Sequence, residues 1–207
     1  TANFNSAGNP EASFNWFTFD GFQAINTTQG NFIRVKFPQN KTVDYFAFYK
    51  TNAAAIGSTI TLQYETTPNL FVDIITVTPL DDSPQLVTFP AVVSGEFRIF
   101  FSSGSEPVFL GVASFGEALR IPFGLETTFN SPHNAQQYEI ISNQSETGNF
   151  IGRSVRKAAT PFNVSTNLLE YDWFVTNWRP FLRHIERRPF FFKWSDNFYN
   201  DETVFFW

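Results

Sequence analysis

Short runs of β-branched and aromatic residues, separated by Gly, Pro, Asn, Asp and Ser, fill the chain from residue 14 to residue 115. This spacing predicts strands and turns, because each run is too short for a helix and is rich in residues that favour a pleated backbone. Eight such runs in about 100 residues are typical of a β-sandwich or jelly roll. The runs are residues 14–19, 32–37, 43–49, 59–65, 71–77, 86–89, 96–101 and 108–115.

The run 32–37 alternates between two kinds of side chain. Ile33, Val35 and Phe37 share one face, and the residues between them form the other. Because successive side chains of a strand point to opposite sides, the first face is expected to be buried and the second to meet water. The chain has no cysteine, so the packing of this core must hold the sandwich together without disulfides.

The pattern changes after residue 118. Apolar residues then recur at the i, i+4, i+7, i+8 and i+11 positions of an amphipathic helix. Asp172 is placed to cap the start of this helix, and Pro189 cannot continue it. The apolar positions are Phe174, Trp178, Phe181, Leu182 and Ile185.

Strand-like runs lie on both sides of this helix. We therefore expect a mainly β protein, with an N-terminal β-sandwich over residues 1–118 and a smaller α+β unit over 119–207. In the second unit the amphipathic helix packs on antiparallel strands, and the aromatic ending predicts that further chain follows it. The expected strand pairs are 148–157 with 161–167 and 190–194 with 203–207.

Composition excludes several classes of function. The net charge of −5 argues against a protein that neutralises phosphates, so no sequence-specific binding of nucleic acid is expected. Without cysteine there is no thiolate nucleophile and no cysteine-bound zinc. No stretch approaches the roughly 20 apolar residues of a membrane helix, so no membrane is expected among the partners.

Side chains suited to catalysis or metal binding are scarce. His133 and His184 are the only histidines, they lie in different contexts, and no G-x-S-x-G motif accompanies them. Adjacent acidic residues such as Asp81 and Asp82 point to opposite faces of a strand, so they favour a turn over an acid/base pair. We expect no catalytic residue, no metal site and no cofactor, and the chain is not expected to be an enzyme.

Three features of the first half occur in a fixed order. These are Asn52, the run GSTITLQY at residues 57–64, and the run FRIF at residues 97–100. Together they resemble the galactose-binding-like jelly rolls of the discoidin type, in which similar strands recur. The resemblance implies a jelly-roll fold. Modules of this kind bind sugars, bind proteins or only pack, so the fold alone does not give the function.

The second half resembles a different family. The segment GNFIGRSVR at residues 148–156, the helix, and the segment RPFFFKW at residues 188–194 look like virion proteins of tailed bacteriophages. Distal tail and tail-tube proteins share this order of strands and helix. The resemblance implies a structural component of the tail or baseplate of the virion, assembled with itself in a ring and docking other tail proteins, with the jelly roll at the periphery.

Such a role would need contacts between identical subunits. The chain contains 28 phenylalanines, five tryptophans and six tyrosines, which could supply apolar contact area. Basic residues on the strand and on the helix could meet the acidic first half of a neighbour. The candidate interface residues are Arg153, Arg156, Lys157, Arg183, Arg187, Phe205, Phe206 and Trp207.

Two alternatives remain. The first is a carbohydrate-binding module that attaches to cell-surface glycans, with Trp16, Phe17 and Tyr49 as candidate stacking residues at a loop end of the sandwich. A host-surface glycan would then be a partner. The second is a glycan hydrolase, which would require two carboxylates roughly 5–9.5 Å apart in a cleft.

Overall fold

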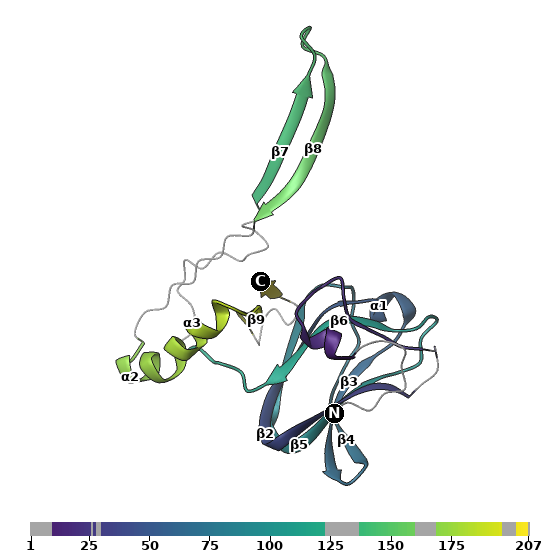
Figure 1. Cartoon of the computed structure of the whole chain (residues 1–207), viewed down its shortest axis with the longest axis vertical. Coiled ribbons are helices and arrows are strands. Elements are labelled where there is room, and N and C mark those ends of the chain that lie inside the picture. Colours follow the sequence, from purple (N-terminus) through teal and green to yellow (C-terminus); the bar gives the residue numbers. More distant parts are fainter. Residues whose placement is uncertain are drawn as a thin grey trace. The chain divides into compact units, whose positions relative to one another are not determined.

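The contacts of the chain divide it into two units, Thr1–Arg120 with Asn177–Trp207, and Ile121–Thr176. The last 31 residues of the sequence therefore group with the first unit, whereas the sequence pattern assigns them to a second domain over 119–207. That domain division stays a prediction. The structure, a computed structural model, describes residues 10–25, 27, 30–122, 137–159, 169–195 and 202–206 (Figure 1).

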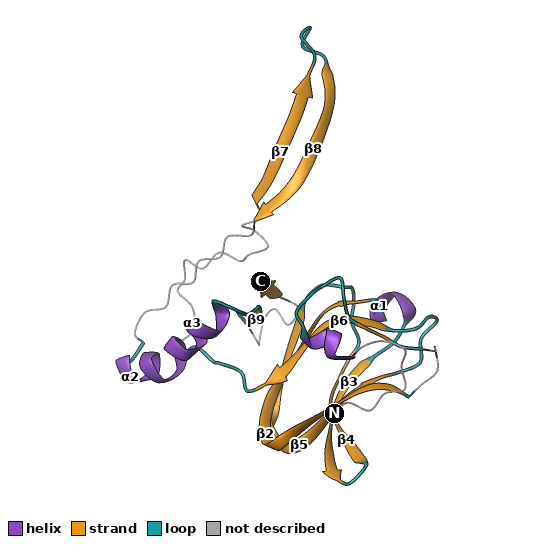
Figure 2. Ribbon diagram, in the orientation of Figure 1, coloured by secondary structure: helices purple, strands orange, loops and turns teal. Residues whose placement is uncertain are grey.

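A six-stranded antiparallel sheet dominates the first unit (Figure 2). Its strands follow the order β1-β6-β2-β5-β3-β4, so the sequence neighbours β3 and β4 form a hairpin at one edge. Two short helices, the 3₁₀-helix η1 (Pro10–Phe14) and α1 (Ala53–Ile56), accompany it. The strands are β1 (Phe22–Gln23), β2 (Asn31–Thr51), β3 (Ile60–Thr67), β4 (Leu70–Val77), β5 (Gln85–Phe101) and β6 (Phe109–Gly116).

Strands β2 and β5 take part in both halves of this sheet. At one end, residues 31–36 of β2 pair with residues 96–101 of β5, and that half continues through β3 to β4. At the other end, residues 45–51 of β2 pair with β6, which carries β1 at its edge. Four predicted strands are thus joined into two long ones.

Two prolines explain why the sequence suggests separate strands. Pro38 lies in the register shift between Lys36 and Lys41, where β2 has extra residues relative to β5. Pro90 lies in the β5 segment opposite the second shift of the same ladder. Because proline has no N–H group to donate, it is tolerated at such bulges and not within a regular ladder. Each proline marks an irregularity within a continuous strand.

Phenylalanines from both halves of the sheet meet in the core. Phe22 of β1 stacks on Phe101 of β5 with ring centroids 5.5 Å apart. Phe97 of β5 contacts Phe37 and Phe115, with centroids 6.1 and 5.6 Å apart. Since Phe115 belongs to β6 and Phe97 lies in the half that contains β3, the two halves face each other. The predicted β-sandwich is confirmed.

The predicted alternation of residues 32–37 is confirmed as well. Ile33 is buried, and Val35 and Phe37 pack against the same core. Arg34 lies on the outer face of the sheet, where its side chain is partly exposed. Period-two patterning therefore gives the correct inward and outward faces here.

The prediction of a strand at residues 14–19 is wrong. Phe14 is the last residue of η1, and a loop follows it. Pro10 opens this helix, in the first turn, where its missing N–H group costs least. Asn15 then accepts a hydrogen bond through Oδ1 from the backbone N–H of Phe17 at 2.9 Å, which is an Asx turn.

The predicted amphipathic helix is present but is divided into three parts. It comprises α2 (Tyr171–Trp173), the π-helical turn η2 (Phe174–Trp178) and α3 (Arg179–Ile185). The N-cap residue is Glu170, and Asp172 lies in the first turn. Pro180 lacks an N–H group and its ring conflicts with a regular turn before it, so the wider π-helical turn at this point has a physical cause.

Two strand pairs complete the described fold. Strands β9 (Phe190–Lys193) and β10 (Thr203–Phe206) are antiparallel, which confirms the predicted C-terminal pair. Strand β8 (Phe150–Ala159) is confirmed, but it pairs with β7 (Gln137–Gln144), a strand the sequence did not suggest. The expected partner, residues 161–167, lies outside the described residues.

Candidate functional site

Two exposed phenylalanines project from the loop of residues 15–20, here called the aromatic loop. The side chains of Phe17 and Phe19 are 55% and 83% exposed, and their rings stack with centroids 5.4 Å apart. In addition to the Asx turn, the Asn15 amide Nδ2 donates a hydrogen bond to Asp20 Oδ2 at 2.9 Å. Hydrogen bonds across the loop thus hold a pair of rings in water.

Two glycines let this loop lie close to β6. A Cβ atom on Gly21 would lie 2.4 Å from the carbonyl oxygen of Leu110. One on Gly111 would lie 3.1 Å from the Cβ of Lys50 and 3.3 Å from the carbonyl oxygen of Thr18. The missing side chains therefore allow the aromatic loop and Lys50 to flank the same point of β6.

A charged pair lies beside the aromatic loop. Lys50 Nζ is 2.6 Å from Asp82 Oδ2, and both side chains are partly exposed. The hydrogen bond to Asp82 raises the pKa of Lys50, so the ammonium group stays protonated. Lys50 Nζ also lies 5.3 Å from the ring centroid of Tyr49. A paired donor and acceptor are thus present at a lysine whose Cβ lies close to the same residue of β6 as the backbone of the aromatic loop.

Two of the predicted stacking residues are half-buried and contact strand β10. The ring of Trp16 stacks on Phe205 of β10 with centroids 6.4 Å apart, and the ring of Tyr49 contacts the same Phe205 at 5.5 Å. Phe205 also contacts Phe191 of β9 at 4.9 Å. Trp16 and Tyr49 therefore support the base of the site, and Phe17 is the most exposed member of the predicted trio.

Phe19, Lys50 and Asp82 are not among the candidate residues predicted from the sequence. Asn15 before the two rings and the dipeptide Asp20-Gly21 after them are turn signals. The aromatic run between these signals also predicts a strand, and that prediction left no exposed loop at residues 15–20. Lys50 and Asp82 are 32 positions apart, so only the tertiary fold reveals their contact.

The predicted interface residues belong to both units. Phe205 is only 7% exposed, and Phe206 stacks on Phe190 with centroids 5.2 Å apart. Arg183 lies on α3 and Arg187 follows it, both exposed. Arg153 is exposed on β8, in the other unit. The backbones of Arg156 and Lys157 also lie in β8, but their side chains, and all of Trp207, lie outside what the structure describes.

A second polar surface covers the outer side of the β2–β5–β3–β4 half-sheet. Arg34 and Arg98 are directly opposite each other on β2 and β5. Arg34 forms ion pairs with the buried Glu96 and, at 3.2 Å, with Glu65. We call this surface the arginine face; it comprises Phe32, Arg34, Gln63, Phe71, Asp73, Arg98 and Phe100.

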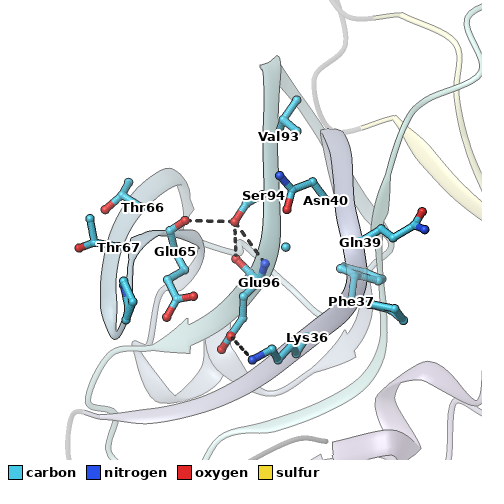
Figure 3. A pocket seen from close by; sticks show the side chains of 13 residues that line it. Lys36, Phe37, Gln39, Asn40, Glu65, Thr66, Thr67, Val93, Ser94 and Glu96 are labelled. Carbon is cyan, nitrogen blue, oxygen red and sulfur yellow. Dashed lines mark hydrogen bonds and ion pairs between the residues drawn. The ribbon is translucent and has the colours of Figure 1, made fainter.

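A polar pocket of about 470 Å³ adjoins the arginine face (Figure 3). The Ser94 hydroxyl lies 3.1 Å from the backbone carbonyl oxygens of Glu65 and Glu96. Lys36 Nζ is 4.0 Å from the Glu96 carboxylate. Phe37, the aromatic residue of its lining, packs against the core. With its charged groups paired and no exposed ring, this pocket is a weaker candidate than the aromatic loop.

Catalytic and metal-binding groups do not gather elsewhere in the described chain. His184 is exposed on α3, and His133 lies outside the described residues. Hydrogen bonds from Ser83 lower the pKa of Asp81, while Asp82 pairs with Lys50, so these two carboxylates serve a turn. Among the residues described, no group of three or more His, Cys, Asp or Glu side chains could hold a metal ion. Nor does any described helix have the length and apolar character to cross a membrane.

Several solved structures of carbohydrate-binding modules are similar to this chain over more than half of its length. No protein-family model and no curated protein matches the chain. Among solved structures, the CBM32 module of AlyQ in complex with 4,5-unsaturated mannuronic acid is 15% identical, with a TM-score of 0.48 over 57% of this chain and 93% of the module. Chitosan-binding module 1 of a chitosanase/glucanase from Paenibacillus sp. IK-5 is 19% identical, with a TM-score of 0.47 over 56% of this chain and 94% of the module.

A third solved structure is CBM32-1 from a family 31 glycoside hydrolase of Clostridium perfringens. It is 9% identical, with a TM-score of 0.45 over 56% of this chain and 89% of the module.

The prediction of a tail or baseplate component of a phage is wrong. The solved structures that match include carbohydrate-binding modules, a rhamnosidase and a putative alpha-L-fucosidase, and no finding supports ring assembly, phage partners or a phage origin. In the chain itself, Phe205 is buried against Trp16 and Tyr49 and offers no ring to a neighbouring subunit. That the chain is not an enzyme stays a prediction.

Proposed function

We propose that the protein is a carbohydrate-binding module and that the aromatic loop is its sugar-stacking surface. The observation that carries this proposal is the exposed, stacked pair Phe17 and Phe19 in a loop closed by its own side chains. Aromatic side chains contribute large apolar contact area, and rings held in water commonly mark a binding surface.

The neighbourhood of the loop suits a sugar. A pyranose ring offers an apolar C–H face, which can lie on a phenylalanine, and hydroxyl groups at its rim, which need donors and acceptors. Lys50 supplies ammonium donors and Asp82 supplies carboxylate acceptors beside the loop. Because the Asx turn and the Asn15–Asp20 hydrogen bond fix the loop before a ligand arrives, little ordering entropy opposes binding.

Removal of both rings tests this proposal. The double variant Phe17→Ala/Phe19→Ala is expected to lose at least about tenfold in affinity for the glycan that the wild-type chain binds, equivalent to roughly 1.4 kcal/mol. Binding would be measured by calorimetry after the wild-type chain has been screened against chitotriose, pectin and 4,5-unsaturated mannuronic acid, ligands named for solved carbohydrate-binding modules.

The matched control is Leu80→Ala, which removes an apolar side chain that is 80% exposed elsewhere on the surface. This variant should bind as the wild-type chain does. Equal binding by the double variant and the control would refute the role of the aromatic loop. Failure of the wild-type chain to bind any glycan of a broad array would refute the proposed function itself.

A further inference from the structure

Arg98 is a half-buried cation that forms no ion pair with any described residue. Its Nε–H group donates a hydrogen bond to Gln63 Oε1 at 2.6 Å. Within the part of the chain that the structure describes, its Nη1 and Nη2 groups have no hydrogen-bond or ion-pair partner. Arg34, directly opposite on β2, differs because Glu65 and Glu96 neutralise it. Of two neighbouring guanidinium groups on the same sheet face, one is paired with carboxylates and the other is bonded to a neutral amide.

Three aromatic rings surround the Arg98 guanidinium group. Its Cζ atom lies 4.2 Å from the ring centroid of Phe71, 5.2 Å from that of Phe32 and 5.5 Å from that of Phe100. Contacts of this kind fix the plane of a guanidinium group without using its N–H donors. Burial, followed by the charge of Arg34, lowers the pKa of Arg98, and the charge of Asp73 opposes this only in part, so the surroundings still disfavour the guanidinium charge.

The nearby acid Asp73 acts on Arg98 through its charge but forms no direct ion pair with it. Asp73 Oδ1 accepts a hydrogen bond from Gln63 Nε2 at 2.6 Å, and Gln63 Oε1 accepts the one from Arg98. Gln63 therefore stands between the carboxylate and the guanidinium group and occupies only the Nε side of the latter. Asp73 is exposed and keeps acceptor capacity for a ligand hydroxyl.

We propose that the arginine face is a second ligand site, which binds the carboxylate of a uronic acid residue through the Nη groups of Arg98. The planar guanidinium fork matches a carboxylate in bidentate fashion. Phe32 and Phe100 are partly exposed beside it and offer apolar surface to the sugar ring. An anion there would also offset the repulsion between Arg98 and Arg34.

This inference rests on the proposed function and extends it to acidic polysaccharides. The aromatic loop adjoins β6, whereas the arginine face lies on β2, β5, β3 and β4. In the strand order, β6 and the hairpin of β3 and β4 are separated by β2 and β5. The two sites are therefore built from different side chains and can be removed one at a time.

The test compares trigalacturonic acid with its methyl ester, which keeps the sugar rings and removes the charge. The wild-type chain is expected to bind the acid at least about tenfold more tightly than the ester, a difference of roughly 1.4 kcal/mol. Arg98→Gln should abolish this preference. Arg98→Lys should restore only part of it, because an ammonium group keeps the charge and lacks the fork.

Lys36→Gln is the matched control. It removes one positive charge from the same half-sheet, from a side chain that is 69% exposed. Binding of trigalacturonic acid by this variant should stay within about twofold of the wild-type chain, since an exposed charge is screened by salt. Equal losses in Lys36→Gln and Arg98→Gln would overturn the proposal, because a diffuse positive field would then account for them.

Further outcomes distinguish failure of the Arg98 site from failure of the proposed carbohydrate-binding function. If the acid and the ester bind equally, or if Arg98→Gln binds the acid as the wild-type chain does, the site at Arg98 is refuted. If in addition Phe17→Ala/Phe19→Ala abolishes binding, the carbohydrate-binding function stands without it. Thermal unfolding of each variant shows that the sandwich is intact, and Arg98→Lys provides the test if Arg98→Gln does not fold.

Discussion

Phe97→Ala is expected to lower the free energy of unfolding by about 3–5 kcal/mol. Phe97 is fully buried and contacts Phe37 of β2 and Phe115 of β6, so its ring joins the two halves of the sheet. Its removal leaves a cavity that the flanking strands can fill only in part. For a chain of this size the unfolding midpoint should fall by about 6–20 °C, measured by circular dichroism or calorimetry.

Phe19→Ala is the control for that experiment. The same truncation at a ring that is 83% exposed should change the free energy of unfolding by less than about 0.5 kcal/mol. A loss below about 1 kcal/mol for Phe97→Ala would show that the halves of the sheet do not close over this residue. Both variants replace phenylalanine with alanine, so the difference between their unfolding free energies reports the effect of burying the ring.

Gly21→Ala is expected to destabilise the fold and weaken glycan binding together. The new Cβ atom would lie 2.4 Å from the carbonyl oxygen of Leu110 and 2.7 Å from the Cα of Gly111, both backbone atoms that cannot swing aside. Separation of β1 from β6 would relieve the clash and would move the attached aromatic loop. We expect a cost of about 1–3 kcal/mol in unfolding free energy and at least a tenfold loss in affinity, roughly 1.4 kcal/mol.

Gly152→Ala is the matched control, because a Cβ atom at that position of β8 would meet no atom within 4 Å. It should leave both unfolding and glycan binding close to those of the wild-type chain. Should Gly21→Ala behave in the same way, the close seating of the loop on β6 would be disproved. Both variants need only calorimetry of unfolding and of ligand binding.

Features with a short repeat could be predicted from the sequence. The alternation around Ile33 gives the inward face of β2, and the spacing from Phe174 to Ile185 gives the helix. Both patterns depend only on the geometry of one element. Strand β7 was missed because polar residues dominate it, and with Ile140 and Ile141 adjacent it has no alternation to detect.

Features that depend on contacts between distant residues could not be predicted. Nothing in the sequence distinguishes Arg34, which has two carboxylate partners, from Arg98, which has no ion-pair partner among the residues that the structure describes. Likewise Trp16 and Phe17 are adjacent aromatic residues, yet one packs on Phe205 and the other faces water. The partner of each side chain comes from another strand, and its position follows from the whole fold.

The abundance of phenylalanine has a simple structural explanation. The largest fully buried side chains include Phe22, Phe46, Phe48, Phe97 and Phe101, all within the sandwich. A chain without disulfides that must stabilise a sheet of six strands needs such residues for its own core. Aromatic composition was therefore a poor guide to subunit contacts.

The stack of Trp16 on Phe205 has a consequence for the order of events during synthesis. These residues are far apart in sequence, and closing so large a loop is slow relative to pairing sequence neighbours. On the ribosome, the support beneath the aromatic loop cannot form until residue 205 has left the exit tunnel. A chain released before that point would carry the aromatic loop without its support at Phe205.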